Sequence, residues 1–384
     1  MRRRPENGAR PVKAGGSGGI GVYPPREEQY PSDPLRYPDV ASRPLRGSVL
    51  AASDEFFAEK ENLIKPGRAT FEAESFGHKG HVYDGWETRR RRGAGGGLPR
   101  DGEHDWVIVR LGAPTVVHAV VVDTAWFRGI YPQSCSVEAC YAAGYPAVDA
   151  LRIARWAEIV PRSPLKGDTP HVFEVTGGRR FSHVRLKIFP DGGVARLRVH
   201  GEVVPDPSLL EGMSFDLAAL ENGGDIVACS DQFYSVPRNA ISPGLSRVMG
   251  EGWETRRRRE AGNEWLVVRL TSRCVVSVAE IDTSGYIGNS PGAARLRGID
   301  TTPDLSPGEA FGAREGEWFD LLPVTALLPD TPHRFRLTGG RPVTAVRLDV
   351  LPDGGIARLR LHGSLTPSGM DAIARRWAQT APAL

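Results

Sequence analysis

The stretch DGWETRRRR at residues 84–92 returns as EGWETRRRR at residues 251–259, and an exchange of one acid for another is the only difference. Other segments return in the same order: SDEFF at 53–57 as SDQFY at 230–234, and PDGGVARLRVHG at 190–201 as PDGGIARLRLHG at 352–363. Self-similarity of this kind marks a duplicated structural unit. We therefore predict that each half of the chain is one copy of the same fold.

Short apolar or alternating runs, bounded by Gly, Pro or Asp, fill the space between the repeated motifs. They lie at 106–111, 116–122, 183–188 and 194–199, and again at 265–270, 275–281, 343–351 and 356–361. Many short strands are typical of sandwiches, so we predict an all-β protein made of two tandem jelly-roll β-sandwich domains. Helical patterns are scarce, and we expect short helices only at 151–159 and 370–377.

The composition is that of a folded chain with room for two cores. Its 384 residues are 40% apolar and 25% charged. We divide them into an N-terminal arm at 1–33, a first repeat at 34–205, a second repeat at 206–366 and a short C-terminal tail at 367–384. The arm is rich in Gly, Pro, Arg and Glu, so we expect it to be flexible and assign it no chemistry.

Charge and cysteine usage bear on the partners and the compartment. The 49 basic side chains nearly balance the 46 acidic ones, so the net charge of +3 suggests neither a nucleic acid nor a membrane as partner. The four cysteines contain no C-x-x-C pair, and we expect reduced thiols in a cytoplasmic protein. The arginines after Met1 precede no apolar export segment, and no run reaches the about 18 apolar residues of a membrane helix.

The acids of the repeated motif are the first candidates for catalysis. Glu87 and Glu254, or Asp84 and Glu251, are placed to act as a general base toward water or to assist a leaving nitrogen. Each of them is equally suited to be a structural partner of the neighbouring arginines. The residues alone leave these two interpretations open.

The tetra-arginine runs are the first candidates for binding. Arg89 and Arg91, with Arg256 and Arg258 in the second copy, offer planar paired donors that fit a carboxylate or a ureido carbonyl. A nucleic-acid or targeting tract is the alternative. However, an acid, a tryptophan and a glutamate precede each run, so the positive charge comes with its own counter-charges. We therefore favour a polar site for a small anion.

Strand alternation sends Arg196 and Arg358 to the face opposite the apolar residues of their strands. We group them with Asp191 and Asp353, in the turns before these strands, as candidate substrate-binding residues. The alternative is a strand with an ordinary charged outer face.

The Gly-rich insertion at 93–101 has no counterpart in the second copy, and we favour a surface loop over a lid.

Two further matched pairs complete the candidate set. Asp123 and Asp282 end corresponding strands, where a carboxylate either binds a ligand or caps a turn. His171 and His333 each follow an Asp-Thr-Pro triplet and are candidates for proton transfer or metal binding. The spacing of His, Cys and Glu forms no recognised metal motif, so any metal ligands remain unknown and a divalent metal stays open.

Together these residues carry a family resemblance. The doubled GWETRRRR motif, the Asp-Thr strand ends and the FPDGGVARLR element at 189–198 resemble the allantoicases, also called allantoate amidinohydrolases, over about residues 39–365. The resemblance implies tandem sandwiches similar to the galactose-binding or discoidin-like fold. It also implies a hydrolase that cleaves a C–N bond of the linear ureide allantoate, giving (S)-ureidoglycolate and urea in purine and allantoin catabolism.

Such a reaction requires an anchor for the carboxylate, a base for water and an acid for the departing nitrogen. The second half has Gly288-Asn289, which resembles the family's loop, whereas the first half has Gly129-Ile130-Tyr131. The two copies are therefore not expected to be equivalent, and one site, two sites or a composite site stay open, as does a homo-oligomer. A non-catalytic tandem ligand- or carbohydrate-binding sandwich is the alternative function, and a nucleic-acid binder is the third.

Overall fold

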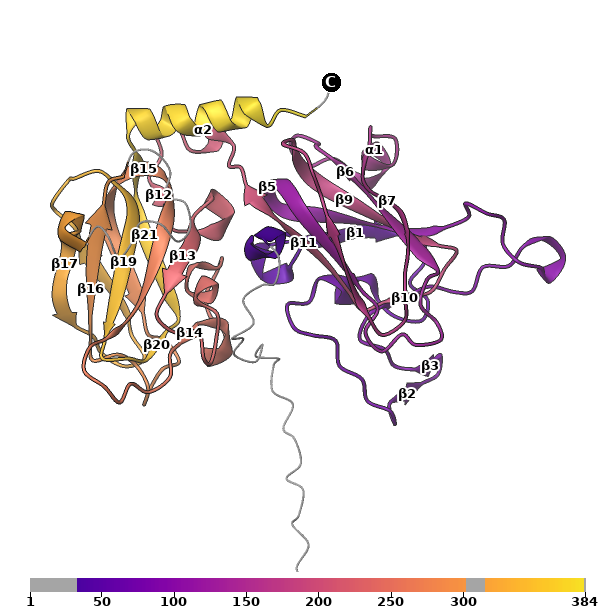
Figure 1. Ribbon diagram of the computed structural model, residues 1–384, viewed down its shortest axis with the longest axis horizontal. Helices are drawn as coiled ribbons and strands as arrows, with labels where there is room; N and C mark the ends of the chain where they lie inside the picture. Colours follow the sequence, from indigo (N-terminus) through magenta and orange to yellow (C-terminus); the bar gives the residue numbers. More distant parts are fainter. Residues whose placement is uncertain (1–32, 302–314, 383–384) are drawn as a thin grey trace, which may run out of the picture.

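The computed structural model describes residues 33–301 and 315–382 (Figure 1). The arm predicted at 1–33 lies outside the described residues, except for its last residue. Two β-rich bodies lie side by side, and a C-terminal helix reaches from the second toward the first (Figure 1). The prediction of an all-β protein with two tandem sandwiches is confirmed.

The first body contains strands β1 to β11, and its strand pairs are antiparallel. The strands are β1 (Ser48–Ala52), β2 (Phe76–Gly77), β3 (Gly80–His81), β4 (Trp86–Glu87), β5 (Asp105–Asp123), β6 (Ser134–Cys140), β7 (Ala157–Pro164), β8 (Pro170–Glu174), β9 (Arg180–Phe189), β10 (Gly193–Val194) and β11 (Arg196–Val203). Its helices are α1 (Val148–Arg152) and the 3₁₀ turns η1 (Asp33–Arg36), η2 (Arg43–Leu45), η3 (Lys60–Ile64) and η4 (Ala94–Gly96).

The 19-residue strand β5 belongs to both layers of the first sandwich. Its beginning pairs with β1 and β9, and β6 and β7 extend that layer beyond β9. Its end pairs with β11 on one side and β8 on the other. A register shift between Arg110 and Thr115 marks the passage between the layers, which is how strands form the corners of a sandwich. The runs at 106–111 and 116–122, predicted as separate strands, are therefore continuous.

The second body repeats this arrangement with the 19-residue strand β15 at its centre. Its strands are β12 (Phe215–Asp216), β13 (Asp225–Cys229), β14 (Trp253–Glu254), β15 (Glu264–Asp282), β16 (Ala293–Ile299), β17 (Phe319–Ala326), β18 (Pro332–Arg336), β19 (Val343–Leu351), β20 (Gly355–Ile356) and β21 (Arg358–Leu365). Its 3₁₀ turns are η5 (Pro207–Leu209), η6 (Leu220–Asn222), η7 (Pro237–Ile241), η8 (Met249–Glu251) and η9 (Glu315–Glu317). Helix α2 (Pro367–Gln379) follows β21 and contains the predicted helix at 370–377.

The helix predicted at 151–159 is wrong for most of its length. Helix α1 ends at Arg152, and the residues from Ala157 onward form β7. Local propensity is a weak guide where tertiary pairing competes with it. Here β7 pairs with β6 and buries the side chain of Val160, which decides in favour of a strand.

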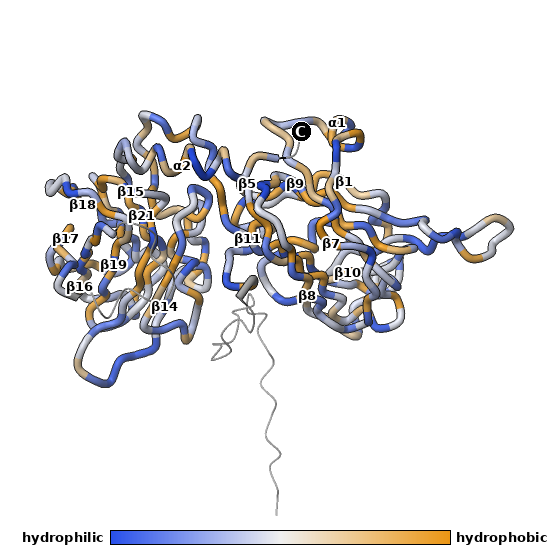
Figure 2. Tube along the Cα trace, turned by 45° about the horizontal axis from the view of Figure 1, so that its top comes forward, coloured by the Kyte–Doolittle hydropathy of each residue, from blue (hydrophilic) through white to orange (hydrophobic). Residues whose placement is uncertain are grey.

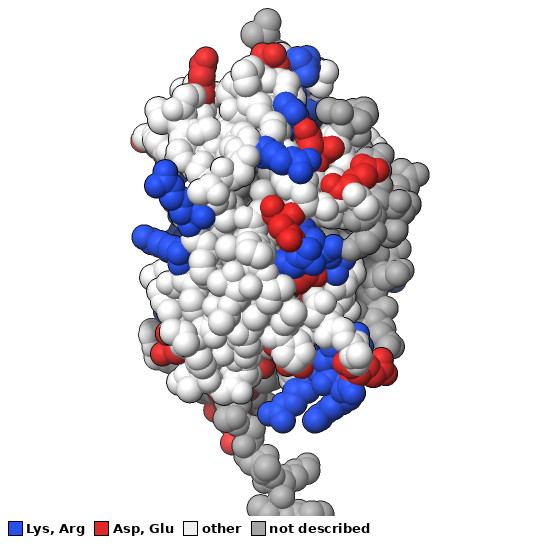
Figure 3. All heavy atoms as spheres, turned by 90° about the vertical axis from the view of Figure 1, so that its left-hand side faces the viewer, with Lys and Arg blue, Asp and Glu red and all other residues white. Residues whose placement is uncertain are grey.

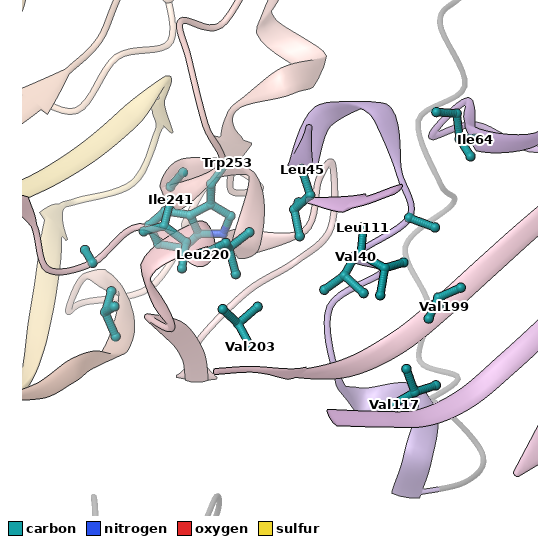
Figure 4. Close-up of a cluster of buried hydrophobic side chains, with 14 of the residues drawn as sticks. Val40, Leu45, Ile64, Leu111, Val117, Val199, Val203, Leu220, Ile241 and Trp253 are labelled. Carbon is teal, nitrogen blue, oxygen red and sulfur yellow. The ribbon is translucent and has the colours of Figure 1, made fainter. Parts of the chain in front are cut away.

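One apolar core continues across the joint between the two bodies. Figure 2 shows hydrophobic residues recurring along the strands of both bodies. In Figure 4, Val40 and Leu45 of the first body approach Leu220, Ile241 and Trp253 of the second, and all five belong to one buried cluster. Burial of apolar surface on both sides of the joint holds the bodies together, because separating them would expose these side chains to water.

Helix α2 adds a polar connection between the bodies. Arg376 forms an ion pair of 2.5 Å with Glu202 on β11. The guanidinium of Arg180 on β9 lies 3.5 Å from the ring centroid of Trp377, and the backbone N–H of Arg180 donates to the carbonyl of Thr380 at 2.8 Å. The segment predicted as a short tail is therefore a connector between the halves. No helix in the described ranges is long and apolar enough to cross a membrane.

A buried histidine makes the stability of the first body depend on pH. His183 on β9 is 1% exposed. Its pKa is lowered from 6.5 to about 4, first by burial and then by the charge of Arg110. The unfolded chain therefore takes up this proton at a higher pH than the folded chain. We expect the free energy of unfolding to fall by on the order of 3 kcal/mol as the pH drops from about 6.5 to about 4, and to be unaffected by this group above that range.

Denaturant unfolding of the protein and of His183→Leu, between about pH 7.5 and pH 4, measures this contribution. The second repeat has Ala345 at the matching position, so the fold itself does not need an imidazole there. The variant is expected to lose less stability on acidification than the parent. Parallel stability curves for the two proteins would contradict the assignment.

Candidate active site

The two most similar segments of the duplication meet at the same end of each sandwich. Strand β4 of the GWE motif pairs with β10 of the PDGG motif, and β14 pairs with β20 in the second body. Figure 1 shows β10, β14 and β20 at the lower end of the two bodies. Both motif tryptophans are fully buried, and their indole N–H groups donate to the carbonyls of Asp54 and Asp231 at 2.7 and 2.9 Å. The repeated motifs therefore build one local structure twice.

Glycine is required where a neighbouring ring packs on the PDGG turn. A Cβ atom on Gly193 would lie 2.0 Å from the ring of Phe127, and one on Gly355 would lie 2.0 Å from the ring of Tyr286. These contacts bring the loop after each long strand against the motif. Residues 130 and 289 are at matching positions in these loops. The carbonyl of Ile130 accepts from the N–H of Gly193, the strand partner of Glu87, and the side chain of Asn289 donates to Glu254.

Arg196 and Arg358, predicted to bind substrate, lie inside the framework of each body. The side chain of Arg196 is 2% exposed, and it donates to the carbonyls of Gly67, Arg68, Asp84 and Ala195 as well as to Oδ2 of Asp84. Arg358 likewise donates to the carbonyls of Asn239, Gly244, Glu251 and Ala357. A guanidinium has five N–H donors, so Arg196 has none left for a ligand.

Burial and like charge both act on Arg358. Its pKa falls to about 10, first because of burial and then because of the charge of Arg360, while the charge of Glu251 acts in the opposite direction. The internal contacts explain why a charged group tolerates this position. We therefore do not retain Arg196 and Arg358 as substrate-binding residues.

Asp84 and Glu251 are tied up in ion pairs. Asp84 accepts from Lys65 at 2.8 Å, from the backbone N–H of Thr70 at 3.1 Å and from Arg196 at 2.5 Å. Burial alone would raise the pKa of Asp84, but these hydrogen bonds outweigh it and lower that pKa. Glu251 has its pKa lowered in the same way by Arg247 against the effect of burial. The contacts favour the structural interpretation of both acids.

The arginine runs divide into paired and unpaired side chains. Arg89 pairs with Asp54 and Arg91 with Asp105, while in the second body Arg256 pairs with Asp231 and Arg258 with Glu264. The turn residues Asp191 and Asp353 accept the backbone N–H groups of Arg91 and Arg258, each at 2.7 Å. The predicted binding residues of both kinds therefore hold the motif in place.

Four arginines of the runs are absent from the sequence-based prediction: Arg90 and Arg257, which lie next to the motif glutamates in sequence, and Arg92 and Arg259 at the ends of the runs. All four are exposed, and none of their side chains forms an ion pair or hydrogen bond with any residue in the described ranges. The signal was available in the sequence. The acids Asp54 and Asp231 occupy matching positions of the two repeats. In an extended segment, successive side chains point to opposite sides, so alternate arginines of each run face these acids and the others point away from them.

Glu87 is the carboxyl group whose environment changes its chemistry most. It is half-buried, and no residue within the described ranges donates a hydrogen bond to its carboxylate. Burial raises its pKa from 4.5 to about 7, although the charge of Arg90 acts in the opposite direction. The pKa of nearby Tyr83 is raised first by burial and then by the charge of Glu87. A carboxyl group that titrates near neutrality is suited to accept and return a proton.

Glu254 has a different environment in the second body. Nδ2 of Asn289 donates to its Oε1 at 2.7 Å, and the hydroxyl of Ser235 accepts its backbone N–H at 2.7 Å. In the first body, Ile130 replaces Asn289 and Ala58 replaces Ser235. The side chain of Ile130 has no donor for a carboxylate, and that of Ala58 has no hydroxyl. The difference between the two copies expected from the sequence is therefore located at the carboxylate itself.

Asp123 and Asp282 cap the turns that follow the long strands. Oδ1 of Asp123 accepts from the N–H of Ala125 at 2.9 Å, and Oδ1 of Asp282 accepts from the N–H of Ser284 at 2.8 Å. This two-residue pattern is the Asx turn, in which the side chain replaces a backbone acceptor. The contacts favour the capping alternative over ligand binding.

His171 and His333 bridge backbone segments through both ring nitrogens. Nε2 of His171 accepts the N–H of Lys166 at 2.8 Å, and its Nδ1 lies 3.1 Å from the carbonyl of Val122. His333 makes the matching contacts with Leu328 and Ile281 at 2.8 and 3.0 Å. Neither nitrogen is left for a substrate proton or a metal, so these contacts count against the predicted catalytic role.

Replacing His171 with leucine is expected to lower the free energy of unfolding by about 2 to 3 kcal/mol, because two backbone groups lose their partner. Denaturant unfolding measures the loss, and catalytic turnover per folded molecule is expected to stay within about twofold of the parent. A large loss of turnover in the folded variant, with normal stability, would restore the catalytic interpretation.

Neither a metal cluster nor a basic stripe is evident in the described parts of the chain. Within residues 33–301 and 315–382, no three His, Cys, Asp or Glu side chains come together in a group that could hold a metal ion. On the face shown in Figure 3, the Lys and Arg side chains lie in separate groups, and several of these groups adjoin Asp or Glu side chains. That distribution does not favour a surface that follows a phosphate backbone.

The fold defines a duplicated β-sandwich protein, and each half carries a candidate site made of a glutamate and an arginine. The family model of the allantoicase repeat matches residues 38–204 and 215–366. A probable allantoicase of Streptomyces coelicolor is 49% identical over 346 residues, which covers 89% of each chain. The allantoicase of Dictyostelium discoideum is 38% identical over 335 residues, covering 86% of this chain and 88% of the relative.

The solved structures agree with the sequence comparison. The crystal structure of allantoicase from Saccharomyces cerevisiae matches with a TM-score of 0.71 and 32% identity, covering 86% of this chain and 93% of the yeast chain. The chain belongs to the allantoicase family.

Proposed function

We propose that this protein hydrolyses allantoate to ureidoglycolate and urea, and that turnover takes place at the first-half site. One observation carries this proposal: the half-buried Glu87 lies beside Arg90, which has no partner among the described residues, in a member of the allantoicase family. Members of that family from other organisms are named for the same activity.

The geometry suggests how the roles are divided. Arg90 offers paired N–H donors to the substrate carboxylate, which places the central carbon near Glu87. The Glu87 carboxylate removes a proton from water as the water oxygen attacks that carbon. The C–N bond breaks, and Glu87 returns the proton to the nitrogen of the departing urea. Atoms and charges balance, and the carboxylate is regenerated.

The second-half site is proposed to bind rather than to turn over. Asn289 fixes one oxygen of Glu254, and the other oxygen can accept a ureido N–H. The hydrogen-bond and ion-pair partners given above for each motif come from its own half, which supports two separate sites over a composite one.

Compartment, partners and domain limits complete the proposal. All four cysteines are free thiols, which supports a cytoplasmic location. We propose no nucleic-acid or membrane partner, and we keep the boundaries at 34–205 and 206–366. Self-association remains a prediction that a measured molecular mass would decide.

The test is urea release from allantoate by the purified full-length protein, with and without added divalent metal. Release well above the blank is the expected result. No release under either condition, together with saturable binding of allantoate, would favour the non-catalytic binding protein. The metal-free arm decides whether the reaction needs a metal ion.

A further inference from the structure

A polar pocket of about 660 Å³ lies at the joint between the two bodies, beside helix α2. Most of its lining comes from three parts of the chain: the end of the first body (Glu202, Val203 and Pro205), strand β15 from Arg269 to Arg273, and helix α2 between Ser368 and Gln379. Gly223, Thr301 and Thr344 of the second body complete the lining. Pockets of this size at domain joints are common places for small ligands.

The lining carries a clear excess of positive charge. Its ionisable residues are the four arginines Arg269, Arg273, Arg375 and Arg376 and the single acid Glu202. Arg376 is paired with Glu202 at 2.5 Å, and Arg273 with Asp300, outside the lining, at 2.8 Å. Two cations thus have a counter-charge within the protein.

Arg269 and Arg375 have no such counter-charge among the residues that the structure describes. The side chain of neither residue forms an ion pair or hydrogen bond with any residue of the described ranges 33–301 and 315–382. Arg269 is half-buried on β15, and Arg375 is on the exposed part of α2, so the two side chains approach the pocket from different elements. Half-burying a guanidinium without an anion is unfavourable, and an anion between the two would offset that cost.

We propose that this pocket binds a small oxyanion, a di- or tricarboxylate or inorganic phosphate, held by Arg269 and Arg375. Guanidinium groups bind both kinds of oxyanion through paired N–H donors. The ligand would contact strand β15 of the second body and helix α2. Arg180 and Arg376 connect this helix to the first body. Ligand binding therefore stabilises the arrangement of the two halves.

This site is distinct from the proposed catalytic sites. Neither motif glutamate lines the pocket, and neither does Arg90 or Arg257. The proposal does not depend on the hydrolysis of allantoate, and it stands or fails by a stability measurement that involves no substrate.

The experiment is thermal unfolding of the full-length protein against rising phosphate or citrate, with ionic strength held constant by chloride. The Tm of the parent is expected to rise by several degrees and to saturate, because a ligand that binds only the folded state stabilises it by mass action. The two anion series show whether phosphate or a carboxylate is preferred.

Three variants locate the effect. Arg269→Gln and Arg375→Gln are each expected to weaken the anion dependence at least tenfold in half-saturating concentration. Arg334→Gln removes an exposed arginine of the second body that is paired with Glu280, and it is expected to keep the parent's dependence. Arg375 is exposed on the helix surface, so Arg375→Gln is expected to fold like the parent. This variant therefore tests the proposal even if Arg269→Gln is unstable. No saturable rise in the parent, or the same rise in parent and Arg375→Gln, would overturn the proposal.

Discussion

Replacing Glu87 with glutamine is expected to lower kcat for urea release from allantoate by about 10² to 10⁴, the usual contribution of a general acid–base group. Glutamine keeps the volume and the polarity but cannot carry the proton. In the parent, kcat/KM is expected to rise with pH through about 7, because Glu87 must be ionised to accept a proton from water and burial raises its pKa to about 7. The variant is expected to lose this rise.

The duplication provides matched controls for this prediction. Glu254→Gln is expected to cost less than about tenfold in kcat, because a binding carboxylate acts mainly on KM. Ile130→Asn would give Glu87 the amide donor that Asn289 gives Glu254, and a hydrogen bond to a carboxylate favours its charged form. The rise of the pH profile is therefore expected to move to lower pH. Full activity of Glu87→Gln, with a large loss in Glu254→Gln, would reverse the assignment of the two halves.

Replacing Arg196 with alanine is expected to lower the free energy of unfolding by about 3 to 5 kcal/mol. The change removes five donated hydrogen bonds from a side chain that is 2% exposed, and it leaves the carboxylate of Asp84 without its shortest partner. Such a loss is large beside the total stability of a domain. Denaturant unfolding, followed by circular dichroism, measures it.

Two comparisons separate this framework role from substrate binding. Arg196→Lys keeps the charge but not the planar fork, so an intermediate loss of stability is expected. Arg89→Ala removes an exposed arginine paired with Asp54, and the expected loss is at most about 1 kcal/mol. If Arg196→Ala were fully stable and only raised KM, Arg196 would contact substrate after all.

Some features follow from local sequence because they depend on short-range chemistry. The alternation at 183–188 and 343–351 predicted strands that became β9 and β19, since one face of each must be buried. The helix predicted at 151–159 failed because pairing with β6 is a long-range contact that local propensity does not contain.

One pair of matched positions on facing strands has its acid and its base exchanged between the two copies. Glu138 of β6 accepts from Arg185 and Lys187 of β9, whereas Asp349 of β19 accepts from Arg347 on the same strand and Arg297 of β16. The acid and one base have exchanged strands between the copies. The ion pair survives because attraction between facing strands depends on opposite charge and not on which strand carries it.

The sequence by itself determined the duplication, the all-β class and the identity of the repeated motifs, because repeated residues and period-two alternation are properties of the chain. The structure then showed that these motifs pair at one end of each sandwich. Only the tertiary structure decided which polar residues are free to act. Arg196, Asp84 and His171 were candidates by residue type, yet their donors and acceptors are used within the fold. Burial and hydrogen bonding of a side chain depend on segments far away in sequence. Among the described residues, these segments give the carboxylate of Glu254 a hydrogen-bond donor and give that of Glu87 none.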